Sequence, residues 1–233
     1  MTRTPLPTGH TPRGQRPPAA WAARLLLVML LLSGCSSLWP PAGTPPALFV
    51  LQPLPAAAPV EPSKVPRQGR PPMASAAAPV LVLQLPSAAA GFDSAHIVYT
   101  QQANRLQTFA RHEWVDTPAR MLAPLMVATL EASGTFRAVV LAPSSAVGGW
   151  QLSTQVLRLQ QEFGALPSRV RLRLRAQLIH TASRQVLGTR DFEHVALSSS
   201  EDAPGGVAAA QVAAHAVLAE LAAWCQSQVL AQP

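Results

Sequence analysis

The stretch with the most regular pattern in this chain is Arg169-Val170-Arg171-Leu172-Arg173-Leu174-Arg175-Ala176-Gln177-Leu178, in which charged or polar residues alternate with apolar ones. Side chains on a β-strand point alternately to opposite faces. The stretch therefore predicts one long strand, with four arginines on one face and five apolar residues on the other. A strand of this kind belongs in a sheet with one buried face and one polar face.

Two further strands flank this one along the chain. Residues 150–163 begin with regular alternation, but the apolar phase moves by one residue near Leu157. A phase slip within a strand predicts a β-bulge. Residues 185–197 alternate more weakly, and we expect Phe192 and Val195 to be their core residues.

A first helix is predicted before these strands. Asp116 or Thr117 can cap it, Pro118 suits its first turn, and Gly134 ends the run. Apolar residues recur at spacings of three and four between these ends, which gives one apolar face. Pro124 falls inside the run and should kink the helix or delay its regular start.

A second helix is predicted at the end of the chain. Residues 198–206 are expected to form a loop, and Val207–Val229 to form an alanine-rich helix. Six residues are expected on its apolar side: Ala214, Val217, Leu218, Leu221, Trp224 and Cys225. If Cys35 is modified, Cys225 has no partner within the chain, which excludes a disulfide scaffold.

The N-terminal half supplies the remaining strands. They are expected at residues 47–51, 80–85, 96–100, 105–110 and 136–141, with a hairpin turn at 101–104 and a loop at 87–91. Four strands, a helix, four strands and a helix would then follow one another, with the arginine strand third in the second group of strands. We therefore predict a single α/β domain with a mixed, largely antiparallel sheet and two main helices.

Composition sets the limits of this domain. Residues 39–79 hold twelve of the 24 prolines and few large apolar side chains, so they cannot bury enough surface to offset chain entropy. We expect a lipidated N-terminus and Pro/Ala-rich linker at 35–79, with the short strand 47–51 inside it, and a folded domain at 80–229. A block of this size is usual for one core.

Net charge does not indicate nucleic-acid binding. The chain has 18 basic and 11 acidic residues, a net charge of +7, but four arginines precede residue 35. The remainder carries 14 basic and 11 acidic residues, a net charge of only +3. Most of the excess therefore belongs to a segment that is predicted to be removed.

The segment that is predicted to be removed ends just before Cys35. Leu25–Leu32 is an apolar run of eight residues, which span about 12 Å as a helix and cannot cross the roughly 30 Å core of a bilayer. A short apolar run behind positive charge predicts an export signal at 1–34. Because Ser33-Gly34-Cys35 follows directly, the segment is similar to a bacterial lipoprotein signal, in which the cysteine is acylated, typically with palmitate as one acyl chain, and becomes the first mature residue. An ordinary signal peptide with a chance cysteine is the alternative.

The sequence contains no catalytic motif that we can identify. It has no G-x-S-x-G, no G-x-x-x-x-G-K-[ST] and no G-x-G-x-x-G. The histidines after residue 35 lack metal-ligand spacing: His96, His112, His180, His194 and His215. We therefore predict no catalytic residue, no metal and no cofactor.

The order and spacing of these elements resemble the ABC-type transport auxiliary lipoproteins, the PqiC/YmbA-like group. The resemblance covers Cys35 to about Val229 and departs from the family pattern in the long Pro/Ala insertion and in Pro124. The segments that carry it are the cysteine signal, Leu48–Leu51, Val80–Leu85, His96–Tyr99 with Asn104–Leu106, Phe109–Trp114 before Pro118, Leu152–Phe163, Arg169–Leu178 and the terminal helix.

The resemblance implies a periplasmic domain that acts by binding and assembly within an MCE-type lipid transport system. Its implied partners are an MCE-family protein and an inner-membrane ABC transporter, whose permease and ATPase lie in other chains; a homo-oligomer is compatible with the sequence. Acylated Cys35 would anchor the domain, and Ser36 and Ser37 favour the outer membrane over the inner membrane. The alternative is a structural envelope lipoprotein with a proline-rich spacer and no transport role.

The arginines of the central strand have two interpretations. Arg169, Arg171, Arg173 and Arg175 could bind an acidic partner or lipid phosphates, because guanidinium groups bind both in a bidentate manner. Alternatively, they form a solvated face or pair with acidic residues on neighbouring strands, for which the candidates are Glu162, Asp191 and Glu193. Trp114 likewise is either a core anchor, which we favour, or a residue that stacks on a ligand.

Overall fold

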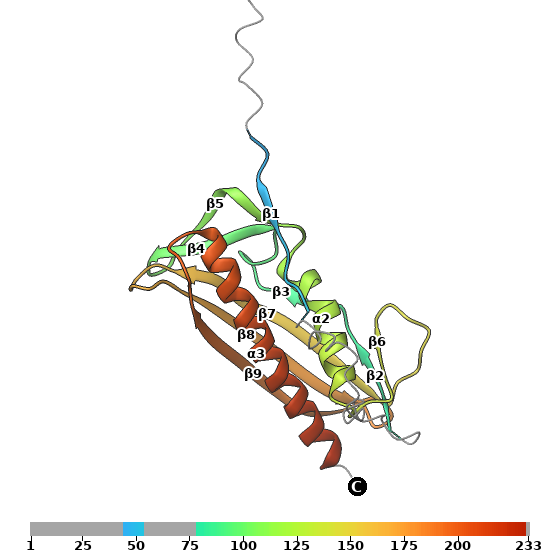
Figure 1. Ribbon diagram of the computed structural model, residues 1–233. Helices are drawn as coiled ribbons and strands as arrows, with labels where there is room; N and C mark the ends of the chain where they lie inside the picture. The colour runs from blue at the N-terminus through green and yellow to red at the C-terminus, as the bar shows by residue number, and fades with distance from the viewer. Residues whose placement is uncertain (1–43, 54–77, 232–233) are drawn as a thin grey trace, which may run out of the picture. The chain divides into compact units, whose positions relative to one another are not determined.

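The computed structural model describes residues 44–53 and 78–231 of the chain (Figure 1). The predicted signal at 1–34, Cys35 and most of the predicted linker lie outside the described residues. Within them the elements follow in the order β1 (Ala47–Phe49), β2 (Val80–Leu83), β3 (Ser87–Ala88), β4 (His96–Gln102), β5 (Arg105–Trp114), α2 (Pro118–Ala132), β6 (Ala138–Leu141), β7 (Trp150–Glu162), β8 (Arg169–His180), β9 (Gln185–Leu197) and α3 (Ala203–Leu230).

Strand β7 is the centre of the sheet, because it joins the long antiparallel strands on one of its edges to the short strands on the other. One edge pairs with β8 along almost its whole length. The other edge pairs in turn with three short parallel strands: β2 near Trp150, β3 at Gln155 and Val156, and β4 at Gln161 and Glu162. Beyond these, β6 lies beside β2, β5 lies beside β4, and β1 lies outside β5.

The sheet is mixed, as predicted, and its longest ladders are antiparallel. Each of the pairs β7–β8 and β8–β9 has twelve residues in register, whereas the parallel pairs have two to four. The predicted hairpin is confirmed as β4 and β5, which turn tightly at Asn104 with φ of 63°. The short strand β3 was expected to be part of a loop, because its small residues have little intrinsic strand preference.

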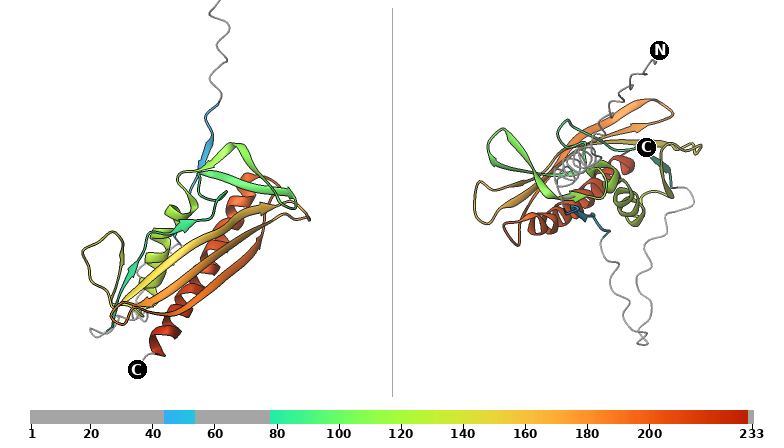
Figure 2. Two further views of the ribbon diagram at one scale, coloured as in Figure 1. Left: turned by 180° about the vertical axis from the view of Figure 1, so that it is seen from behind. Right: turned by 90° about the horizontal axis from the view of Figure 1, so that it is seen from above.

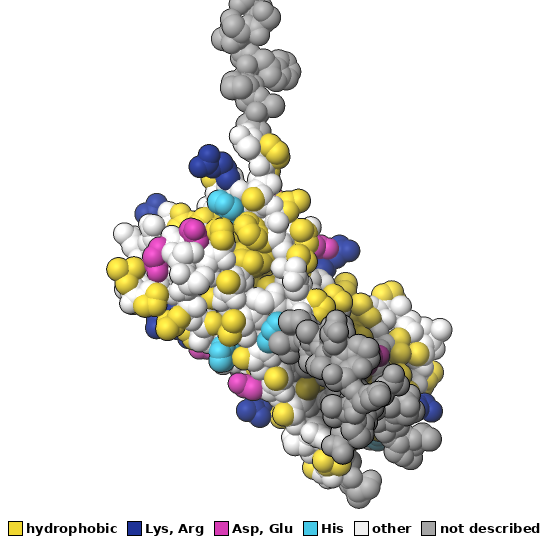
Figure 3. Space-filling view, in the orientation of Figure 1, with side chains coloured by type: hydrophobic (Ala, Val, Ile, Leu, Met, Phe, Trp, Pro, Cys, Tyr) yellow, Lys and Arg dark blue, Asp and Glu magenta, His cyan; other side chains and the backbone are white. Residues whose placement is uncertain are grey.

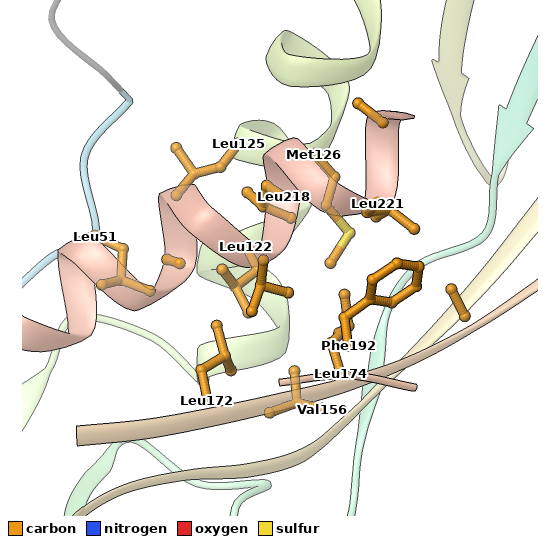
Figure 4. Packing of buried hydrophobic residues seen from close by; sticks show 14 of the residues in the cluster. Leu51, Leu122, Leu125, Met126, Val156, Leu172, Leu174, Phe192, Leu218 and Leu221 are labelled. Atoms are coloured by element: carbon orange, nitrogen blue, oxygen red, sulfur yellow. The ribbon is translucent and has the colours of Figure 1, made fainter. Parts of the chain in front are cut away.

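Helices α2 and α3 both cover one face of the sheet (Figures 1 and 2). Seen from behind in Figure 2, the strands β7, β8 and β9 lie in front of the helices, so their other face is open. The buried face of the sheet and the two helices form the hydrophobic core (Figure 4). Its members include Leu122, Leu125 and Met126 of α2, Leu218 and Leu221 of α3, Leu172 and Leu174 of β8, Val156 and Phe192.

The bulge predicted in β7 is confirmed at Leu157. Val156 pairs with Leu174 and Arg158 with Arg173, so Leu157 is the additional residue. The expectation for β9 was half wrong: Phe192 is 1% exposed, but Val195 is 37% exposed. Residues three apart on a strand point to opposite faces, so the two cannot share the core.

Helix α2 begins and ends where the sequence predicted. Thr117 occupies the N-cap position, Pro118 begins the helix, and Ser133 is the C-cap residue. Gly134 follows with φ of +67°, a conformation that glycine adopts without strain. Pro124 does not delay the regular start of the helix, which runs from Pro118 to Ala132 with the exposed Pro124 inside it.

Helix α3 begins four residues earlier than predicted, at Ala203. The Asp202 side chain caps it by accepting a hydrogen bond from the Gly205 backbone N–H at 2.9 Å. Hydrogen bonds from Ser200 and Gly205 lower the pKa of Asp202. By length and composition α3 could cross a membrane, but half of its most apolar stretch is buried inside the protein. The six residues expected on its apolar side are all buried, so α3 is a core helix.

A buried polar cluster lies where α3 meets the sheet. Gln161 donates from Nε2 to the hydroxyl oxygens of Ser168 and Ser198, at 3.0 Å and 3.4 Å. Gly206, in the first turn of α3, packs directly against the amide of Gln161. A Cβ atom at Gly206 would lie closer than 3.0 Å to Gln161 Oε1, so only glycine allows the helix this close to the strand.

Candidate partner-binding surface

The open side of β7, β8 and β9 carries a network of charges, which we call the arginine face. The bulge at Leu157 determines its membership, because even-numbered residues of β7 face the core before the bulge and odd-numbered residues do so after it. The bulge therefore turns Arg158 and Glu162 outward. The charged members are Arg158, Arg169, Arg171, Arg173, Arg175, Glu162, Asp191 and Glu193.

A first cluster forms around Glu162. The Arg169 Nε lies 2.9 Å from Glu162 Oε2, and the Arg171 Nε lies 2.8 Å from Glu162 Oε1. Arg171 also donates from Nη1 to Glu193 on β9. Two carboxylates on opposite neighbouring strands thus hold one guanidinium group, and Arg171 is the least exposed of the four arginines on β8.

A second cluster forms around Asp191. Arg175 binds this carboxylate in a bidentate manner, with Nε 2.7 Å from Oδ1 and Nη2 3.0 Å from Oδ2. Arg173 donates to the same carboxylate from Nη2 at 2.8 Å. Because Asp191 lies on β9 directly across from Arg175, the antiparallel register between β8 and β9 creates this cluster.

Hydrogen bonds from arginine keep both acidic centres ionised. Partial burial alone would raise the pKa of Glu162, but hydrogen bonds from Arg171 and Arg169 outweigh it and lower the pKa to about 2. The hydrogen bond from Arg175 is the main cause that lowers the pKa of Asp191 to about 2. The face therefore keeps five positive and three negative charges at neutral pH, a net charge of +2.

Arg158 differs from the other arginines of this face. It is exposed, stands directly across from Arg173, and makes no ion pair with any residue of the described ranges. It lines an open groove of about 390 Å³ together with Gln160, Glu162 and Arg169, between the tip of the β4–β5 hairpin and the end of β7. The uncompensated positive charge of the face is thus concentrated beside a polar groove.

The structure brings together the four arginines that the sequence singled out, Arg169, Arg171, Arg173 and Arg175, and pairs them with the three carboxylates named as alternatives. Partner binding by these arginines stays a prediction. Arg158 was missed, although the phase slip at Leu157 was visible in the sequence. Applying that slip to the residues after it would have moved Arg158 onto this face.

The other candidate residues are structural. Trp114 is buried in the core, as favoured from the sequence. Burial raises the pKa of the Cys225 thiol to about 12, so it is not a reactive thiolate at neutral pH. Within residues 44–53 and 78–231, no group of three or more His, Cys, Asp or Glu side chains could hold a metal ion.

Comparison with known proteins adds a family. A family model described as the ABC-type transport auxiliary lipoprotein component matches residues 63–222. No curated protein matches the sequence at a significant level. The match covers the central strands, both ladders of the arginine face and most of α3.

Solved structures share the fold. The chain is similar to protein XCC0632 from Xanthomonas campestris, with 26% sequence identity and a TM-score of 0.61 over 78% of this chain and 93% of that one. It is also similar to the crystal structure of an uncharacterized protein, with 13% identity and a TM-score of 0.56 over 80% of this chain and 99% of that one. The second likeness, at this low identity, concerns the fold alone.

Proposed function

The chain belongs to the family of ABC-type transport auxiliary lipoproteins, and we propose that it is the lipid-anchored accessory of an MCE-type intermembrane lipid transporter. In this role it acts by binding and assembly, and the ATPase and permease lie in partner chains. The domain has no catalytic function in this proposal. The family match supports the transport role, and the arginine face supplies a surface for a partner.

The observation that carries the proposal is the order within the arginine face. Glu162, Glu193 and Asp191 hold four guanidinium groups in fixed positions on a rigid ladder, so binding a partner costs little side-chain entropy. Arg158 adds a positive charge that has no carboxylate within the described part of the chain. A partner with an acidic surface, such as a segment of the MCE protein, would supply the missing carboxylate.

Acylation of Cys35 is the second part of the proposal. We propose that the lipid holds the domain at the outer membrane, on its periplasmic side, because Ser36 and Ser37 follow the cysteine. The Cys35→Ser protein should no longer incorporate labelled palmitate and should leave the membrane fraction while keeping its unfolding transition. Full incorporation of palmitate by the variant would contradict the assignment of Cys35.

The partner surface is best tested by reversing Arg158. The reversal of Arg171 is less informative, because it would place a third carboxylate beside Glu162 and Glu193 and disturb the fold. Arg158→Glu changes an exposed side chain that makes no ion pair in the described ranges. Arg137→Glu is the matched control, because Arg137 is also exposed and lies just before β6, at the other end of the sheet.

The measurement is crosslinking and co-purification from intact envelopes. We expect the wild-type and Arg137→Glu proteins to recover an MCE protein and ABC components, and Arg158→Glu to recover at least about tenfold less, which corresponds to a loss of 1.4 kcal/mol. Equal recovery by Arg158→Glu and Arg137→Glu would show that the arginine face is not part of the interface. If the wild type recovers no such partner, the structural role with a proline-rich spacer becomes the better explanation.

A further inference from the structure

We propose that the outer side of the β1–β5 corner, formed by Leu48, Val50 and Val115, lies against the lipid surface in which Cys35 is anchored. This inference rests on the proposed acylation of Cys35. It adds an orientation to that anchor, because it names the part of the domain that faces the bilayer. Three observations lead to it: how firmly β1 is held, which side chains it exposes, and how short the connection to Cys35 is.

Strand β1 is an integral part of the domain. It pairs in parallel with β5 from Ala47 opposite His112 to Phe49 opposite Trp114, and the Val115 backbone N–H donates to the Phe49 carbonyl at 2.8 Å. Two residues later, Leu51 is only 4% exposed and belongs to the hydrophobic core (Figure 4). The segment that leads back to Cys35 is therefore fastened to the sheet and to the core.

A side-chain clip holds the end of this segment against α3. The Gln52 backbone N–H donates to Gln211 Oε1 at 2.7 Å, and Gln211 Nε2 donates back to the Gln52 carbonyl oxygen. The same carbonyl lies 3.0 Å from His215 Nε2. One glutamine thus satisfies both backbone groups of Gln52, as a neighbouring strand would, and a pull on the tether is transmitted to the whole domain.

The most exposed outward side chains of β1 and of the residue that follows β5 are apolar, whereas Glu113, across from Leu48, is half-buried and its Oε1 lies 3.5 Å from His96 Nδ1. Alternation along β1 places Leu48 and Val50 on the side opposite Phe49, which packs against the core. Leu48, Val50 and Val115 are 61%, 45% and 51% exposed. Arg111 lies on the same side of β5 as Glu113 and Val115, because these residues are spaced two apart along the strand. Arg111 is also exposed. Figure 3 shows hydrophobic side chains gathered where the chain enters β1, with basic side chains beside them.

The tether identifies the lipid surface as the occupant of this patch. Only eleven residues, Ser36–Pro46, separate Cys35 from Ala47, the first residue of β1. Fully extended, they span at most about 40 Å, so the β1 end of the domain can never be farther than this from the lipid. Such a short connection gives a weakly apolar patch a local lipid concentration that it would not meet in solution. Apolar side chains with an arginine beside them suit the boundary between acyl chains and headgroups.

Depth-dependent quenching tests the orientation. Full-length acylated protein carrying Leu48→Cys, Val50→Cys or Val115→Cys is labelled with an environment-sensitive fluorophore and reconstituted in vesicles of phosphatidylethanolamine and phosphatidylglycerol with brominated acyl chains. The native Cys225 is buried and stays unlabelled. The control is Val147→Cys, which is also apolar and exposed but lies before the start of β7, about 40 Å along the sheet from its β4–β5 end.

We expect brominated lipid to quench the three labels of the β1–β5 corner by at least about twofold and to leave the label at position 147 unchanged. Equal quenching at all four positions, or none at the corner, would overturn the orientation. If the emission of the corner labels shifts with protein concentration and does not depend on bromine, the patch binds a second copy of the chain. That result would also overturn the orientation. Failure of palmitate labelling would instead count against the anchor at Cys35.

Discussion

Arg171 binds Glu162 in a bidentate manner, with Nε 2.8 Å from Oε1 and Nη2 3.3 Å from Oε2. Glu162 reaches the open face of the sheet only because Leu157 forms a bulge five residues earlier in the same strand. A backbone irregularity thus decides an electrostatic contact. The same bulge turns Arg158 outward, so one extra residue in β7 sets both the order and the excess charge of the arginine face.

Glu162→Gln should lower the free energy of unfolding at pH 7 by about 1–3 kcal/mol, because it leaves Arg169 without a charged acceptor and leaves Arg171 with Glu193 alone. The pKa of Glu162 is lowered from 4.5 to about 2, so its stabilising contribution is present above about pH 4.5 and is lost as the pH falls towards 2. When unfolding by urea is measured across this pH range, the free energies of unfolding of the wild type and of Glu162→Gln should converge at low pH.

The matched control for this experiment is Glu220→Gln, since Glu220 is exposed on α3 and makes no ion pair in the described ranges. Its unfolding free energy should stay within about 0.5 kcal/mol of the wild type at every pH. A stability difference for Glu162→Gln that is the same at pH 7 and at pH 2 would show that its charge is not what stabilises the fold.

Deletion of Leu157 should cost more than about 3 kcal/mol or prevent folding. Without the extra residue, either residues 150–156 or residues 158–162 must turn their apolar side away from the core. Leu157→Ala keeps the bulge and should cost less than about 1.5 kcal/mol. Thermal unfolding of the two variants compares them, and similar stabilities would mean that the bulge does not set the register.

Gly206→Ala should destabilise the protein by about 1–3 kcal/mol, although alanine is the better helix former. The added Cβ would meet the buried amide of Gln161, which cannot move away without losing its hydrogen bonds to Ser168 and Ser198. Gly149→Ala is the control, because a Cβ there meets nothing within 4 Å. In the double variant Gln161→Ala/Gly206→Ala, the loss in free energy of unfolding should be smaller than the sum of the losses in the two single variants.

Cys225 should be protected from thiol reagents in the native protein. Its thiol is buried, and burial raises its pKa to about 12, so both access and ionisation limit the reaction. The rate of labelling should therefore follow unfolding and rise steeply with urea. In the same protein, the thiol introduced by Val147→Cys should react at once. Equal native-state rates at the two positions would show that α3 opens locally.

Local patterns in the sequence were sufficient for most elements of the fold. The alternation from Arg169 to Leu178 predicted β8, and the apolar spacing from Ala214 to Cys225 predicted the buried side of α3. The positions of most strands and the bulge in β7 were also visible, because each depends on the periodicity of neighbouring residues, although β5 continues to Trp114, four residues beyond its predicted end. Val195 was wrongly assigned to the core, because the weak alternation of β9 does not indicate which of its faces is buried.

The candidate site could be predicted only in part. The four arginines of β8 follow from alternation, but their pairing depends on register with β7 and β9. A register shift of one residue would have turned Glu162 or Asp191 away from them. The groove beside Arg158 and the patch at Leu48, Val50 and Val115 depend on segments that meet only after folding, so no local pattern could reveal them.

The sequence by itself determined the α/β character of this protein, the alternating faces of its strands, the limits of α2 and the buried side of α3, because these features are decided by neighbours a few residues away. Only the tertiary structure decided that β7 joins β2, β3 and β4 along one edge, that Glu162 shares Arg169 and Arg171, and that β1 is fastened to β5. These contacts join residues far apart in the chain, and the packing of the whole domain selects among the pairings that the local patterns permit.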